Sequence, residues 1–202
     1  MFQDTAQTKS DPRELMQKTA LDFANRNFSE INKLATAEPS VQSSTKLSQE
    51  LAKIVGLSPD STLQVRVWGG VPGRVNIFVQ EPLGKRYEFD VDIQNGQFRF
   101  ADLKDYPHTQ GKNPRTLTAQ ETLKVHLEYH GVMYKDGIDM SKDLALSVGL
   151  PSAAGCKVEV KPGEKGGTYI VSMLLNDKPA LSAEIKEKPD MTFDVSGIKI
   201  NK

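Results

Sequence analysis

The chain has 202 residues, with 26 basic side chains, 26 acidic side chains and a single cysteine, Cys156. This balance argues against a nucleic-acid or membrane-surface ligand, because such binders carry net or clustered positive charge. One cysteine excludes an internal disulfide and favours the cytoplasm, with export by a non-classical route as the alternative. No run approaches the roughly 18 apolar residues of a membrane span, and none is expected.

The first elements expected along the chain are a tail and two helices. Residues 1–10 are polar and are expected to form a flexible tail. The run Asp11-Pro12-Arg13-Glu14 combines an N-cap, a proline and a capping-box glutamate, and apolar residues follow at three- and four-residue spacing. The pattern predicts one long amphipathic helix over residues 12–36. Ser43 or Ser44 is expected to cap a shorter helix that Gly56 ends.

Residues 62–103 predict a four-stranded antiparallel meander. Asn95-Gly96 fits a two-residue hairpin turn that pairs Ile93 with Phe98, and the preceding turn opposes Val79 to Tyr87. This register places the apolar residues on one face, which the two helices are expected to cover.

The outer face of this sheet carries the first candidate binding residues. Strict alternation places Trp68 and Phe78 on that face beside Arg66, a grouping that is enriched at binding hot spots. One alternative is that these are scattered apolar surface residues without a binding role. The other is that Trp68 folds over its own hairpin.

The second half repeats the plan of the first. Residues 47–57 recur as residues 140–150 with six of eleven positions identical, which indicates an internal duplication. A capping box at Thr118 predicts a helix to about His130, stopped by Gly131, and a short helix near 140–148. A meander follows over about 155–200. The predicted fold class is α+β, an internal duplication of a helix pair plus a four-stranded antiparallel β-meander. Its expected parts are the tail 1–10, a first module 11–104, a linker 105–116 and a second module 117–202.

The strand predicted over residues 169–175 is apolar on both faces. A strand that is apolar on both faces is usually buried on both faces, and a partner chain could pack against one of them. Tyr169, Val171 and Met173 are therefore further candidates for protein binding. The alternative is that the C-terminal segment with Ile198 and Ile200 roofs the outer face of this strand.

His126 and His130 are the candidate metal ligands of the sequence. They stand four residues apart on a predicted helix, so both imidazoles can reach one ion. Glu128 points roughly 160° away from the pair and is a poor third ligand. Two ligands without a third favour hydrogen-bonded structural histidines, and we expect no metal, no cofactor and no catalytic residue.

These observations favour a non-enzymatic protein-binding function. At the level of fold alone, the predicted architecture resembles bacterial secretion chaperones and similar adaptor modules. The expected molecule is an adaptor or chaperone-like, pseudo-twofold tandem that binds a protein partner through exposed sheet faces and could form oligomers. One alternative is a small apolar-ligand carrier or enzyme, with a pocket near His126 and His130 or lined by core aromatics such as Tyr87 and Phe89. Another is a structural subunit of a virion or secretion assembly.

Overall fold

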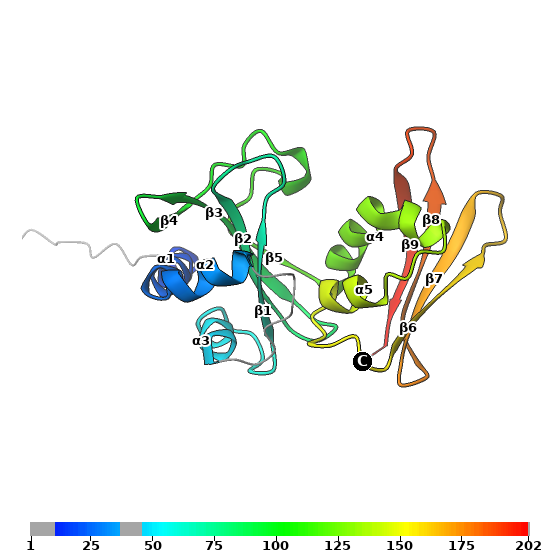
Figure 1. Cartoon of the computed structure of the whole chain (residues 1–202), viewed down its shortest axis with the longest axis horizontal. Coiled ribbons are helices and arrows are strands. Elements are labelled where there is room, and N and C mark those ends of the chain that lie inside the picture. Colours follow the sequence, from blue (N-terminus) through cyan, green and yellow to red (C-terminus); the bar gives the residue numbers. More distant parts are fainter. Residues whose placement is uncertain (1–10, 37–45, 202) are drawn as a thin grey trace, which may run out of the picture.

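The computed structural model describes residues 11–36 and 46–201, and these form an α+β fold with two antiparallel sheets (Figure 1). The predicted tail 1–10 and the predicted cap at Ser43 or Ser44 lie outside the described residues. The α+β class predicted from the sequence is confirmed. None of the described helices is long and apolar enough to cross a membrane.

The helix predicted over residues 12–36 is two helices, α1 (Pro12–Arg26) and α2 (Phe28–Thr36). The predicted cap is present, because the side chain of Asp11 accepts from the amide of Arg13. The break lies at Asn27, whose φ of −110° departs from the helical value of about −63°. Its side-chain amide donates to the carbonyl of Phe23, a local bond of the kind that competes with regular helix geometry. Helix α3 (Lys46–Ile54) follows.

The first sheet has the predicted strand order and register. Strands β1 (Thr62–Val67), β2 (Arg74–Gln80), β3 (Arg86–Gln94) and β4 (Gln97–Phe100) are neighbours in sequence order. Val79 faces Tyr87 and Ile93 faces Phe98, as the turns predicted. The inner face packs against α1, α2 and α3 in one hydrophobic core, which includes Ala20, Phe23, Ile31, Leu51, Leu63, Ile77, Phe89 and Phe98.

The predicted linker is attached to the first sheet rather than free. It contains the 3-10 helix η1 (Pro107–Thr109), and its last two residues belong to β5 (Arg115–Leu117), which pairs with β3. The side chain of Asn113 accepts from the amide of Asp90 and donates to the carbonyls of Asp90 and Ala101. These hydrogen bonds hold the predicted linker against strand β3, which contains Asp90.

Helix α4 (Ala119–Lys135) begins at the predicted capping box of Thr118 and Glu121. It does not stop at Gly131, as the sequence predicted, but continues to Lys135. A Cβ atom at Gly131 would lie 2.4 Å from Cγ of Phe193. The glycine therefore permits a close approach between α4 and strand β9 (Phe193–Ile200), and helix termination is not its role. Helix α5 (Ser141–Ser147) follows α4.

The second sheet is the meander β6 (Cys156–Pro162), β7 (Thr168–Leu175), β8 (Lys178–Glu187) and β9. Its inner face and the two preceding helices share a second core, which includes Leu123, Leu127, Leu144, Val148, Val171, Met173, Leu181 and Ile185. Ile198 and Ile200 belong to β9 and pack against this same core. The predicted roof over the outer face of β7 is therefore wrong, and Ile170 on that face is exposed.

The layers follow one another as helices, sheet, helices, sheet (Figure 1). Helices α1 to α3 cover one face of the first sheet, while α4 and α5 lie between the two sheets. The halves share the order helices then meander, as the predicted duplication requires. Their relation in space is head to tail and not the expected pseudo-twofold, because the helix side of the second half meets the sheet side of the first.

Candidate functional site

The outer face of the first sheet holds the C-terminal end of α5. The side-chain amide of Gln64 donates to the carbonyl of Leu146 over 2.8 Å, and the guanidinium of Arg86 donates to the carbonyl of Ser147 over 3.0 Å. Carbonyls at a helix C-terminus have no partner within the helix. The first sheet therefore supplies additional donors to the last carbonyls of α5, and directed hydrogen bonds dock the two halves.

Charged side chains on the same face form a buried network. Arg86 lies 3.3 Å from Glu88, and Arg115 pairs with both Glu88 and Asp90. Trp68 donates its indole N–H to Asp90 over 2.6 Å. Burial raises the pKa of Asp90, against the opposing effect of Arg115. Burial also lowers the pKa of Arg86 to about 10, so this guanidinium stays charged at neutral pH.

Phe78 does not face solvent, and the prediction that it does is wrong. It has 0% of its surface exposed and lies under two guanidinium groups, with the carbon of Arg86 at 3.9 Å and that of Arg66 at 5.0 Å from its ring centroid. Trp68 is half-buried and packs edge-on against Tyr106. Alternation along the strand assigns the face correctly, but it cannot indicate that another part of the chain covers that face.

The candidates on β7 are also unavailable as a contact surface. Val171 and Met173 are fully buried in the second core, and Tyr169 is half-buried against it. The expected exposure of these side chains is wrong, because they pack in or against the core that α4 and α5 cover. Arg66 is the member of the predicted set that is exposed.

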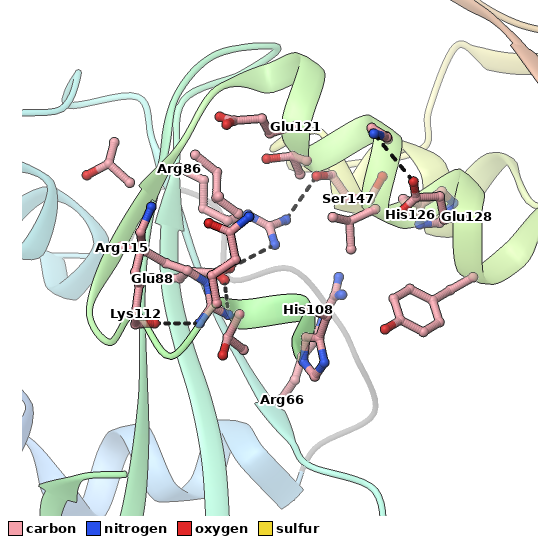
Figure 2. Close-up of a pocket in the computed structure, with 18 of the residues that line it drawn as sticks. Arg66, Arg86, Glu88, His108, Lys112, Arg115, Glu121, His126, Glu128 and Ser147 are labelled. Carbon is pink, nitrogen blue, oxygen red and sulfur yellow. Dashed lines mark hydrogen bonds and ion pairs between the residues drawn. The ribbon is translucent and has the colours of Figure 1, made fainter. Parts of the chain in front are cut away.

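A cavity of about 490 Å³ lies between the first sheet, the connecting segment and α4. Figure 2 shows side chains that reach it from both sides, with Arg86, Glu88 and Arg115 on the sheet side and Ser147 and His126 on the helix side. All three histidines of the chain line this cavity. Five basic residues face three acidic ones in its lining, namely Arg66, Arg86, Lys112, Arg115 and Lys124 against Glu88, Glu121 and Glu128.

Two of the five cations have no carboxylate at ion-pair distance. Arg86 and Arg115 are paired within the buried network, and Lys124 lies 3.7 Å from Glu128 one turn along α4. Within residues 11–36 and 46–201, Arg66 and Lys112 form no ion pair, and both residues have exposed surface. Burial of its guanidinium nevertheless lowers the pKa of Arg66, against the opposing effect of Glu88 and Asp143. Hydrogen bonds with Thr118, and then the charge of Lys112, lower the pKa of Glu121. Among the lining residues cations therefore outnumber carboxylates, and Arg66 and Lys112 are the two that keep their charge without a close ion pair.

The predicted histidine pair is present, with ring centroids 4.7 Å apart. His126 is buried, and a 2.8 Å hydrogen bond joins its Nε2 to the hydroxyl of Tyr134. Burial, then the neighbouring His130, lowers the pKa of His126 to about 3, and burial also lowers the pKa of His130. Both rings are neutral at pH 7. No group of three His, Cys, Asp or Glu side chains that could hold a metal ion occurs in the described part of the chain.

Sequence reasoning missed this cavity because its lining comes from segments that are distant in the sequence. Arg66 and Arg86 belong to the first sheet, His108 to η1, and His126 and Ser147 to the second half. One signal was present. The outer face of the first sheet alternates charges of both signs around Phe78, which is more typical of a covered polar face than of a solvated one.

No family model, no curated protein and no solved structure matches this chain.

Proposed function

We propose that this chain is a binding protein whose ligand carries negative charge and is held in the cavity between the two halves. The observation that supports this most directly is that Arg66 and Lys112 have no carboxylate at ion-pair distance, at a cavity whose other cations are already paired. Opposite charge at a partly desolvated site gives both affinity and selectivity.

The chemistry of the lining fits an oxyanion. A guanidinium presents donors in a planar fork that matches a carboxylate or a phosphate, and an ammonium adds a mobile point charge. The neutral imidazole of His130 can donate one further hydrogen bond. A volume of about 490 Å³ lies within the roughly 300–1,000 Å³ that ligand pockets occupy.

The alternative predicted from the sequence, an apolar ligand, does not suit this cavity because its walls bear eight charged side chains. The aromatic residues predicted to line an apolar pocket, Tyr87, Phe89, Phe98 and Phe100, pack in or against the first core instead. Phe89 and Phe100, for example, meet edge to face. The location predicted near His126 and His130 is kept in this proposal, and the chemistry of the ligand is changed.

Calorimetric titration of the whole chain with sulfate, phosphate and citrate tests this proposal. We expect at least one of these anions to bind, and we expect Arg66→Gln and Lys112→Gln each to weaken that binding about tenfold, since a charge-assisted hydrogen bond is worth about 1.5–3 kcal/mol. Lys199→Gln, an exposed lysine on β9 away from the cavity, is the matched control. Absence of binding up to ~10 mM anion, or equal loss in the control, contradicts the proposal.

A further inference from the structure

Helix α4 exposes an apolar row on the side opposite to its core. Val125 is 42%, Tyr129 63%, Val132 42% and Met133 36% exposed. These positions recur at i, i+4, i+7 and i+8, so at about 100° per residue they share a single stripe. A surface helix ordinarily has one apolar stripe, which faces the core. In α4 that role belongs to Leu123, Leu127 and Tyr134, so a second stripe needs another explanation.

The exposed row is continuous with the cavity. Val125 and Tyr129 belong to the cavity lining, whereas Val132 and Met133 lie beyond it toward the C-terminal end of α4. The row extends about 12 Å along the helix, at about 1.5 Å per residue. It therefore begins within the lining of the cavity and continues beyond it along α4.

We infer that the negative charge that fills the cavity is a carboxylate of a protein segment, whose apolar side chains lie along Val125, Tyr129, Val132 and Met133. This inference rests on the proposed function. A free small anion would satisfy Arg66 and Lys112 but would leave the apolar row exposed to water. A segment with an acidic residue followed by apolar residues would neutralise the cations and cover the row together.

The two parts of this surface contribute differently to recognition. Burial of the row supplies affinity through the hydrophobic effect, which grows with the apolar area removed from water. The carboxylate fixes the position of the segment along α4. A segment bound in a shifted position would leave its carboxylate desolvated without a cationic partner. A row of four side chains is small beside the surface that stable interfaces bury, so we expect a transient contact. The protein-binding function predicted from the sequence thus becomes a proposal about α4 rather than about the sheet faces.

The experiment is a selection of random dodecapeptides displayed on phage against the intact chain. Enriched peptides are then synthesised, labelled and titrated by fluorescence polarisation. We expect the enriched peptides to combine at least one acidic residue with apolar residues, and their glutamine versions to bind at least tenfold more weakly. Sulfate is measured in parallel as the free anion.

Two variants separate the inference from the function on which it rests. Val132→Ser/Met133→Ser alters the row outside the cavity lining, so it should weaken peptide binding at least tenfold and leave sulfate binding unchanged. Arg66→Gln should weaken both. Ile138→Ser removes an apolar side chain, 47% exposed, that lies outside the row and should change neither. Circular dichroism checks that each variant keeps the fold.

The outcomes are distinct. If sulfate binds but no peptide is enriched, or if Val132→Ser/Met133→Ser has no effect on peptide affinity, the ligand is a free anion and the inference fails while the proposed function stands. If neither sulfate nor any peptide binds, both fail. Enrichment of apolar peptides without acidic residues also overturns the inference, because it removes the role of the cavity.

Discussion

His126 shows how a single residue couples burial to pH. Its ring is shielded from water, bonded to Tyr134 and close to the cations of the first sheet. A charged imidazolium there would lose its hydration without gaining a carboxylate partner, which is why its pKa is so low. The same ring in the unfolded chain takes up its proton near pH 6.5.

The stability of the protein should therefore fall as the pH is lowered through and below 6.5. In this range the unfolded state binds a proton that the folded state does not bind until about pH 3. The contribution of one such group is at most about 1.4 kcal/mol per pH unit. In urea unfolding at pH 7.0, 6.0 and 5.0, His126→Gln should show a shallower loss than the wild type. Equal slopes in the two proteins would refute this assignment.

Gly131 allows a second prediction at the residue scale. Gly131→Ala places a methyl group against the ring of Phe193, which is itself buried. Overpacking of this kind costs about 1–3 kcal/mol, more than the helix propensity that alanine gains. The free energy of unfolding in urea measures the loss. The control is Gly166→Ala, where nothing lies within 4 Å of the added carbon. A stabilising effect of Gly131→Ala would contradict this prediction, because it would mean that the close approach to Phe193 does not require a glycine.

At the scale of elements, the first sheet has two covered faces of different chemistry. The inner face is apolar and packs on helices, while the outer face is polar, charged and covered by the second half. Phe78 is the large aromatic side chain within that polar face, between strands that carry Gln64 and Glu88. Its burial has to be maintained by the packing of guanidinium groups above it.

Phe78→Ser should consequently be strongly destabilising. Removing a buried phenylalanine costs about 3–5 kcal/mol, and the serine hydroxyl would add a polar group with few partners. Val67→Ser, at the end of β1 with 57% exposure, should cost less than about 1 kcal/mol. Thermal denaturation of both variants makes the comparison. A loss under about 1 kcal/mol for Phe78→Ser would mean that the outer face of β2 is not covered in solution.

The register of the first sheet was predictable, because a two-residue turn and strict alternation act locally on the chain. Helix starts were predictable for the same reason, as Asp11 and Thr118 show. The break at Asn27 and the passage of α4 through Gly131 were not, since both depend on contacts that the local pattern does not encode. The burial of Phe78 was missed for a related reason, because the end of α5 that docks on this face lies 61 and 82 residues along the chain from Arg86 and Gln64.

At the scale of the whole molecule, the halves should unfold together. The bonds from Gln64 and Arg86 to the end of α5 are buried, and breaking them exposes groups on both sides. The protein has one tryptophan, Trp68, in the first half, whereas circular dichroism reports both halves. Urea transitions followed by the two signals should coincide in the wild type. They should separate in Arg86→Met, which removes the guanidinium donor at the interface and leaves Glu88 with one cation fewer. Non-coincident transitions in the wild type would show that the halves are independent.

The cavity itself was only partly predictable from the sequence. The two histidines were placed together correctly, because four residues along a helix is a local relation. Arg66 was singled out for its aromatic neighbours. Lys112 was not, because nothing in a polar connecting segment indicates that it is attached beside a sheet. The charge of the cavity arises from the docking of the two halves, which no local pattern encodes.

The head-to-tail order of the layers sets a direction for the molecule. A twofold pair closes on itself, whereas a heterologous contact repeats the same step and can in principle be extended without limit. The outer face of β6–β9 occupies the position at which a third helix pair would dock, but Lys157, Glu159 and Lys161 there are exposed. Extending the stack would strip the hydration from these three charges. These charges on the outer face of the second sheet therefore disfavour the addition of further copies, and with it the growth of a filament.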